Sequence, residues 1–396
     1  MMPSASLLAA VAAVLLSSCN ALDNDSGPVP SPQTPVAETV VPVTDITPES
    51  VARMLSGLSL GLDQVKEVHS AVTASSANGY DEEYPFSCVF RSPGLGVGDE
   101  LLQTRSYSFE SESLAGLIEA SSTGTRSGCD ALSGSGLQIY WPYSEDWDGE
   151  TMPVITFNPE ISDEVSSRNL PDGSNIGFLR EQLTDGSWIV KEVVVDEEYA
   201  MEHPVWVVNA NEDAGYLTPQ MVEALYPEMS AVAATRTTSE FRTLVLKEFK
   251  AHRNYDSWLA GGSEFFIKCG ALDGFKAQTE DEIKLYTPSV TDMMINVKRK
   301  QVGKTLRFNS VVVSEWSPQL EECVFLMIED DGGKQTSWKA SGTVKIKSKS
   351  YGFEVEIPLN RNDDLVWRGK LSSAYFEKYN GAASRFGDVS VTFAFK

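Results

Sequence analysis

Helical spacing of apolar residues occurs in three segments of the first half of the chain. The first follows Thr47-Pro48-Glu49, which places a capping hydroxyl before a proline in the first helical turn. We expect Asp63 to cap the second. The apolar positions of the three predicted helices are Val51, Met54, Leu55 and Leu58, then Val65, Val68 and Val72, then Leu114, Leu117 and Ile118.

Short apolar runs follow these segments and predict strands. They are Gln138–Trp141, Val154–Phe157, Phe178–Leu183, Trp188–Val195 and Val205–Asn209. Thr184-Asp185-Gly186-Ser187 is a turn between two of them. This part of the chain is therefore predicted to be an α+β domain, without a defined topology.

The second half has the pattern of an all-β domain, in which apolar or alternating runs are separated by turn signals such as Asp330-Asp331-Gly332-Gly333. The predicted strands are Phe241–Lys250, Ser263–Cys269, Asp281–Tyr286, Met293–Lys300, Leu306–Trp316, Glu322–Glu329, Gly342–Lys349, Phe353–Leu359 and Val389–Phe395. Their number and length favour a β-sandwich. One helical turn is expected near Ser372–Tyr379.

Charge divides the chain at the same place. Residues 1–240 carry 9 Lys and Arg against 36 Asp and Glu, whereas residues 241–396 carry 23 against 20. We predict two domains, an acidic α+β domain at 47–229 and a β-sandwich at 241–396, joined by a linker at 230–240. The overall net charge of −24 argues against a nucleic-acid partner, because such binding depends on neutralising phosphates.

Basic residues of the second half offer a way for the two domains to meet. Lys345, Lys347 and Lys349 alternate along a predicted strand and would share one face, and Lys298-Arg299-Lys300 adds positive charge. One hypothesis is that this face docks on the acidic domain. The alternative is an ordinary solvated strand face.

The N-terminus has the features of a lipoprotein signal peptide (residues 1–18). Leu7–Leu16 is an apolar run of about ten residues, half of what a membrane-spanning helix needs. It ends in Leu16-Ser17-Ser18-Cys19, which resembles the bacterial lipobox and implies cleavage before Cys19 and lipid attachment to its sulfur. No Lys or Arg precedes the run, a departure from the usual pattern. The alternative is an ordinary secretory signal that contains a cysteine.

Residues 19–46 are rich in Pro, Ser, Thr and acidic residues, which predicts an extended, Pro-rich tether. Asp23 and Asp25 resemble the surface-export signals of Bacteroidota lipoproteins. This resemblance implies a lipid-anchored protein of the bacterial outer membrane that faces the cell surface. An anchor that faces the periplasm is the alternative.

Four further cysteines, Cys88, Cys129, Cys269 and Cys323, fall two in each predicted domain. Their even number and an oxidising compartment favour disulfides, and the domain division favours Cys88–Cys129 with Cys269–Cys323. Buried free thiols are the alternative. Their spacing matches no zinc motif.

Signals for catalysis are absent from the sequence. His69, His203 and His252 belong to no catalytic or metal-binding motif, and the chain has neither a G-x-S-x-G elbow nor a phosphate-binding loop. The sequence therefore points to no catalytic residue and, apart from a divalent cation, to no cofactor.

Two acidic loops at predicted strand ends carry ligands that suit a hard cation. The candidate metal ligands are Glu329, Asp330, Asp331, Asp363 and Asp364. Calcium takes six to eight oxygen ligands of this kind, so the hypothesis is a Ca²⁺ site. The alternative is plain turn chemistry, because Asp and Gly also make turns.

The densest aromatic stretch contains Tyr140, Trp141, Tyr143 and Trp147. Exposed aromatic rings beside carboxylates stack on sugar rings, so one hypothesis is a glycan-binding site. The alternative is that these side chains pack a domain edge.

Several segments are similar to those of uncharacterised cell-envelope lipoproteins of Bacteroidota. They are Tyr140–Tyr143 with Trp147–Gly149, Met152–Phe157, Pro204–Asn209 and Tyr255–Glu264. The resemblance supports an envelope location and implies no particular activity.

These patterns together favour a membrane-anchored envelope or surface lipoprotein with a non-catalytic binding or assembly role. Its partners would be the membrane, through the N-terminal lipid, and a glycan or another envelope protein. One alternative is a carboxylate-dependent hydrolase that acts on glycans or peptides through the N-terminal domain. Another is a purely structural envelope component.

The anchor can be tested by metabolic labelling with a fatty-acid precursor. We expect the wild-type chain to take up the label and a Cys19→Ser variant to take up none, because the sulfur is the attachment point. Uptake of label by the variant would refute the lipid anchor.

Overall fold

The computed structural model describes residues 46–90, 113–121, 126–159, 170–185, 187–227 and 240–396. The predicted signal peptide, Cys19, almost all of the tether and of the linker lie outside these ranges. Val43–Lys396 belong to one compact unit. No helix within the described ranges is both long and apolar enough to cross a bilayer.

The first part of the described chain is α+β, as predicted. Its mixed sheet has the order β1-β2-β6-β3-β4-β5, in which β3 and β6 run parallel. The strands are β1 (Glu83–Pro85), β2 (Leu137–Tyr140), β3 (Val154–Phe157), β4 (Asn175–Gln182), β5 (Trp188–Val195) and β6 (Val205–Ala210). The helices are α2 (Pro48–Gly57), α3 (Leu62–Ala77), α4 (Phe86–Val89), α6 (Leu114–Ala120), α7 (Arg126–Ser133), α8 (Glu197–Glu202) and α9 (Pro219–Leu225), with a 3₁₀ turn, η1 (Ser144–Asp146).

The predicted helix starts are correct for α2 and two residues late for α3. The Thr47 hydroxyl accepts a hydrogen bond from Ser50 N, and the Ser50 hydroxyl interacts in return with the Thr47 backbone. Helix α3 is capped at Gly61, so Asp63 lies inside its first turn, where a negative charge is still favourable.

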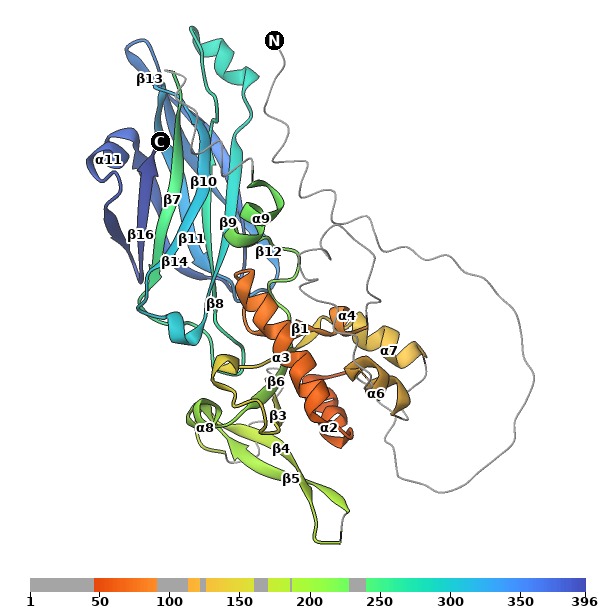
Figure 1. Ribbon diagram of the computed structural model, residues 1–396. Coiled ribbons are helices and arrows are strands. Elements are labelled where there is room, and N and C mark those ends of the chain that lie inside the picture. The colour runs from red at the N-terminus through yellow and green to blue at the C-terminus, as the bar shows by residue number, and fades with distance from the viewer. Residues whose placement is uncertain (1–45, 91–112, 122–125, 160–169, 186, 228–239) are drawn as a thin grey trace, which may run out of the picture. The chain divides into compact units, whose positions relative to one another are not determined.

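The two faces of the N-terminal sheet are covered by different parts of the chain. Along β6, Trp206 and Val208 point to the helix-covered face, and Val205 and Val207 point to the opposite face. In Figure 1, α2 and α3 lie against this sheet. The opposite face packs against α8 and against Trp258 and Leu259, which belong to the second part of the chain.

The second part is all-β and has two antiparallel sheets, as predicted. One has the order β10-β7-β16-β15, and the other has the order β13-β12-β11-β8-β9 with β14 also paired to β11. The strands are β7 (Arg242–Ala251), β8 (Ser263–Ala271), β9 (Ser289–Val297), β10 (Leu306–Trp316), β11 (Leu320–Glu329), β12 (Gln335–Ile346), β13 (Lys349–Asn360), β14 (Asp364–Ser372), β15 (Ala383–Phe386) and β16 (Val389–Phe395). Helix α11 (Ser373–Lys378) is the expected turn of helix.

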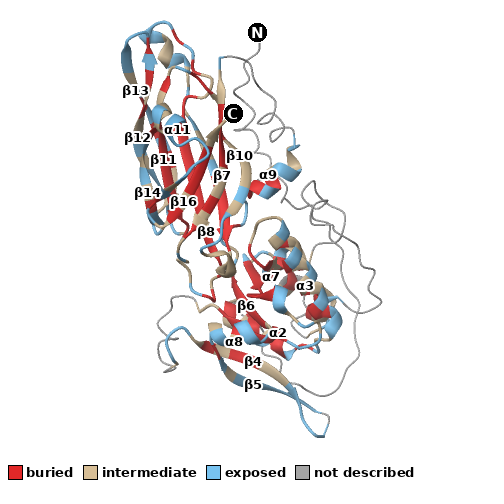
Figure 2. Cartoon of the chain, turned by 60° about the vertical axis from the view of Figure 1, so that its left-hand side comes forward, coloured by how far each residue is buried: buried red, intermediate tan, exposed pale blue. Residues whose placement is uncertain are grey.

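The main core of the second part lies between its two sheets. It includes Phe249 of β7, Phe265 of β8, Phe325 of β11 and Phe393 of β16. Strand β11 is buried along both of its faces, as its apolar pattern predicts, because Val324 and Leu326 enter a separate cluster on the other side of the sheet. In Figure 2 the buried residues form continuous stretches along these central strands.

The structure corrects two strand predictions in the second part and adds two strands. Residues 281–286 fall mainly in a 3₁₀ helix, η3 (Glu280–Leu285), where Glu282 accepts hydrogen bonds from Gln278 N and the Thr279 hydroxyl. Strands β14 and β15 were not predicted. Lys347 lies in the hairpin turn between β12 and β13 with a φ of +57°, so it cannot share a strand face with Lys345 and Lys349.

The disulfide prediction is wrong, because no two of the four described cysteines are bonded to each other. In the second part, Cys269 of β8 lies opposite Phe325 of β11, so Cys323 is its diagonal neighbour. Diagonal positions on neighbouring strands are farther apart than a disulfide spans, although the two thiols are in contact. In the first part, Cys88 and Cys129 lie on the separate helices α4 and α7.

Alkylation followed by intact-mass measurement tests this correction. We expect iodoacetamide without reductant to modify all four cysteines in denaturant, since no bond protects them. In the native protein, Cys269 and Cys323 should resist because both are about 1% exposed or less. A denatured chain that gains only two groups would instead indicate a disulfide.

Candidate metal centre

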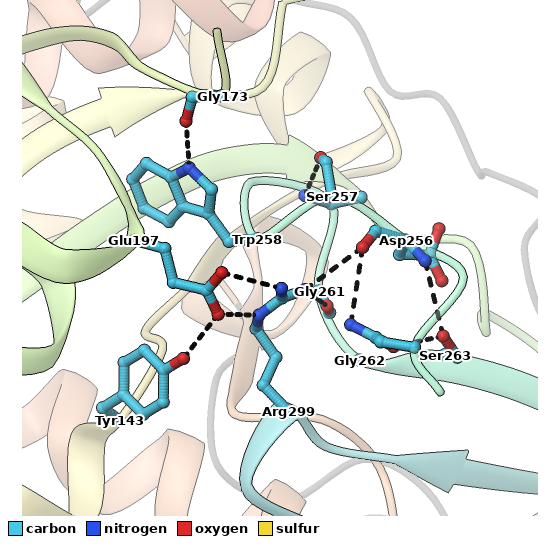
Figure 3. A network of polar contacts seen from close by, with 12 residues as sticks. Tyr143, Gly173, Glu197, Asp256, Ser257, Trp258, Gly261, Gly262, Ser263 and Arg299 are labelled. Atoms are coloured by element: carbon cyan, nitrogen blue, oxygen red, sulfur yellow. Dashed lines mark hydrogen bonds and ion pairs between the residues drawn. The ribbon is translucent and has the colours of Figure 1, made fainter. Parts of the chain in front are cut away.

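The segment between β7 and β8 packs against the first part of the described chain. Trp258 packs on the free face of the N-terminal sheet, and its Nε1 donates to Gly173 O at 2.7 Å (Figure 3). Asn209 Nδ2 of β6 donates to Leu259 O at 3.2 Å. The backbone N of Gly262 donates to Asp81 Oδ2 at 2.6 Å. We call residues 255–264, which include the first two residues of β8, the joint.

Glycine is required at position 261 of the joint. Its φ is +141°, and a Cβ there would lie 2.7 Å from Asp81 Oδ2. The close approach of the joint backbone to Asp81 therefore depends on the absence of a side chain.

Basic residues of the second part contact acids of the first, but they are not the predicted lysine face. The Arg299 guanidinium pairs with Glu197, which also accepts a hydrogen bond from the Tyr143 hydroxyl at 2.7 Å (Figure 3). Lys300 pairs with Glu145 at 3.2 Å and with Asp146. The docking hypothesis therefore holds for Lys298-Arg299-Lys300. Lys345 instead pairs with Glu321 of its own sheet.

Strand register gathers acidic side chains at one end of the β11 sheet. Glu329, the last residue of β11, lies opposite Phe265 near the start of β8 and opposite Asp364 at the start of β14. The carboxylate oxygens of Glu329, Asp331 and Asp364 lie within 4.8 Å of one another. Those of Asp256, Glu264 and Glu329 form a second group with the same spacing, so Glu329 belongs to both.

Glu329 is the unusual member of this cluster. Its side chain is 0% exposed, and neither of its carboxylate oxygens has a hydrogen-bond donor. It faces Asp256, whose Oδ2 also lacks a donor. Burial, together with the Asp256 carboxyl, raises the pKa of Glu329 to about 11. Two carboxyl groups in such contact must share a proton or hold a cation between them.

The first part of the chain adds buried acids to the same region. Asp81, Glu83 and Asp213 are all buried. Burial raises the pKa of Glu83 well above its usual range, and the charges of Asp213 and Asp81 raise it further. The negative charge of Asp81 also raises the pKa of Asp256 and Glu264 in the second part. The acids of the two parts therefore form one electrostatic cluster.

Cationic partners for the buried acids of this region are few among the described residues. Lys298 lies 3.9 Å from Glu82, and Lys268 pairs with Asp292 at 2.7 Å. No lysine, arginine or histidine of the described ranges forms an ion pair with Asp81, Glu83, Asp213, Asp256, Glu264 or Glu329. Burying charges without counter-charges is costly, so this cluster needs protons or bound cations.

The donor set suits a hard divalent cation. Both grouped sets consist of carboxylates alone, with no His or Cys, and oxygen-only ligands favour Ca²⁺ or Mg²⁺ over zinc. Strand ends and loops supply them without an enforced octahedral arrangement, which fits the larger and more adaptable Ca²⁺. Calcium bound there would replace the protons that the carboxyl groups otherwise need.

The predicted metal ligands divide into two roles. Glu329, Asp331 and Asp364 lie together, as predicted. Asp330 Oδ1 instead accepts hydrogen bonds from Gly332 N and Asn360 Nδ2, and Asp363 accepts one from Asn360 N, so these two carboxylates organise their loops. The sequence interpretation missed Asp256 and Glu264. The small, glycine-rich stretch between them was the available signal that the backbone there approaches another element.

The central residues of the aromatic glycan-site hypothesis are buried. Tyr140 and Trp141 are each 1% exposed and enter the two clusters on opposite faces of the N-terminal sheet. Tyr143 is buried at the joint, and Trp147 packs against Trp141 with ring centroids 5.3 Å apart. These residues pack the domain edge, which was the alternative.

The three histidines each contact a nearby oxygen atom, and two acids of the N-terminal part are buried. His69, His203 and His252 contact Ser144 O, Tyr199 O and the Ser390 hydroxyl, respectively. Glu83 and Asp213, the buried acidic pair of the N-terminal part, are 6% and 5% exposed.

The chain matches no protein-family model, and a search of curated proteins finds no match either. Its function must therefore be inferred from its own residues, and the acidic cluster is the most distinctive group among them.

The acidic cluster predicts that the chelator-treated protein loses stability as pH rises. Burial raises the pKa of Asp213, Glu212 and Asp363 to about 7, whereas such groups titrate near 4 in an unfolded chain. The folded state thus binds more protons between these values. These extra protons stabilise the folded state. Their contribution is complete below about pH 4 and is lost as pH rises through about 7.

Thermal melts in EDTA at pH 5 and pH 8 measure this effect. We expect a melting temperature several degrees higher at pH 5. An equal or higher value at pH 8 would mean that the carboxylates are compensated in some other way.

Proposed function

We propose that this protein is a lipid-anchored bacterial envelope protein with a non-catalytic binding or assembly role, and that calcium at the acidic cluster holds its two folded parts together. The lipobox-like Leu16-Ser17-Ser18-Cys19 supports the anchor, and the resemblance to Bacteroidota lipoproteins supports the outer-membrane location. The buried, unpartnered carboxylate of Glu329 is the observation that supports calcium.

A bound cation at Glu329 would act on both parts of the chain. Asp256 and Glu264, which flank the backbone that Asp81 binds, lie within reach of the same ion. Neutralising them would remove a repulsion that now extends to Asp81. Calcium would in this way favour the packed joint, and the protein would present a partner with one fixed arrangement of its two parts.

Calcium-dependent stability tests this function. We expect millimolar Ca²⁺ to raise the melting temperature of EDTA-treated protein at pH 8, because ligand at a hundred times its dissociation constant contributes about 2.7 kcal/mol. Mg²⁺ should have a smaller effect. In Glu329→Gln, calcium affinity should fall tenfold or more, which corresponds to about 1.4 kcal/mol.

The chosen substitution separates binding from folding. Glutamine resembles protonated Glu329, the form that the raised pKa favours without metal, so the variant should fold. Glu223→Gln, an exposed acid on α9, is the matched control and should respond to calcium as the wild type does. A wild-type protein indifferent to calcium, or a Glu329→Gln variant with the full response, would exclude the calcium site.

A further inference from the structure

The face of the N-terminal sheet opposite α2 and α3 carries a second set of oxygen ligands beside the joint. Gln138 of β2 lies opposite Asn209 of β6, and Tyr140 lies opposite Glu83 of β1. Directly paired residues share a face, as do residues two apart on one strand. Glu83, Gln138 and Asn209 therefore point to the same side of the sheet, and the side chain of Asp213 contacts Glu83 there.

Three buried oxygens of this set have no donor. They are Asp213 Oδ2, Gln138 Oε1 and Asn209 Oδ1. These side chains are 5%, 4% and 1% exposed. Buried acceptors are normally satisfied, so three unsatisfied oxygens beside Glu83 need an explanation.

The orientation of the Asn209 amide is fixed by its other end. Its Nδ2 donates to both Leu259 O and Ala260 O of the joint. Rotating the amide would place its oxygen against two carbonyl oxygens, which repel it. The oxygen of Asn209 must therefore remain the unsatisfied atom, and it needs a donor or a cation rather than a different rotamer.

We infer that Glu83, Asp213, Gln138 and Asn209 form a second divalent-cation position, separate from the one at Glu329. Glu83 and Asp213 match the charge of one Ca²⁺. With the oxygens of Asn209 and of Gln138, whose amide now donates to Glu83 and would have to rotate, they supply four of its six to eight ligands. The inference rests on the proposed function in that both positions take calcium. Asn209 would bind the ion through its oxygen and the joint through its nitrogen, so the second ion also stabilises the contact between the two parts.

The electrostatics of the pair agree with this geometry. Burial raises the pKa of Asp213 to about 7, with a further contribution from Asp81. No described lysine or arginine pairs with Asp213 or with Glu83. The described residues therefore provide no cationic side chain to this position.

Counting bound calcium by equilibrium dialysis with ⁴⁵Ca²⁺ tests the second position. The full mature chain should bind at least two ions at pH 8. Asp213→Asn should bind one fewer, since it removes one of only two charged ligands. Glu329→Gln should also bind fewer ions but keep the one at Asp213, and the exposed Glu223→Gln should match the wild type.

The outcomes separate the two proposals. If Asp213→Asn keeps the wild-type count while Glu329→Gln loses ions, the second position is wrong and the first stands. If Glu329→Gln keeps the wild-type count, the proposed function fails, and a loss in Asp213→Asn alone would then support only the second position. If the wild type binds no calcium, both fail.

Folding of the variants is checked by their melts in EDTA. Asparagine resembles protonated Asp213, so Asp213→Asn should melt no lower than the wild type at pH 8. If it nevertheless melts lower, Glu83→Gln replaces it in the count, with the same expected loss of one ion. A Glu83→Gln variant that folds and binds the full number of ions would overturn the second position.

Discussion

Buried carboxyl groups from both parts of this protein meet where the two parts pack. Asp81 comes from the first part and Asp256, Glu264 and Glu329 from the second, and they meet where the joint backbone hydrogen-bonds Asp81. Apolar contacts at Trp258 and Leu259 favour this packing. Ionisation of these groups opposes it, because a charge there loses its hydration without gaining a partner. The net stability of the joint therefore depends on what neutralises the cluster.

The basic triplet Lys298-Arg299-Lys300 neutralises acidic side chains only at the edge of the joint. Arg299 is held between Glu197 and the carbonyl oxygens of Asp256 and Gly261, which links α8 of the first part to the joint. Lys300 pairs with partly exposed acids, and exposed pairs contribute little to stability. The interior of the cluster lacks comparable pairs among the described residues. The ion pairs thus help to orient the two parts, whereas the buried carboxyl groups need protons or a cation to neutralise them.

Much of the fold could be predicted from the sequence, because its elements depend on local patterns. Val205–Ala210 and Leu320–Glu329 are short apolar runs between turn signals, and each forms the predicted strand. The metal candidates at Glu329, Asp331 and Asp364 were found because they sit next to such runs. Asp81, Glu83 and Asp213 were missed because their proximity depends on register between distant segments. In a chain with 56 acidic residues, composition alone does not distinguish the buried ones.

Protons and calcium compete for the same carboxylates, and this competition links the compartment to the state of the joint. At acidic pH the raised pKa values keep these groups neutral, so their mutual repulsion is absent. Near pH 7 the protons leave groups such as Asp213 and Glu212, and in the proposed function calcium would take their place, with an affinity that rises as they dissociate. Extracellular calcium sites often have dissociation constants near 10⁻⁴ to 10⁻³ M. A site of that strength would be filled outside the cell, so the joint would loosen only where both protons and calcium are scarce.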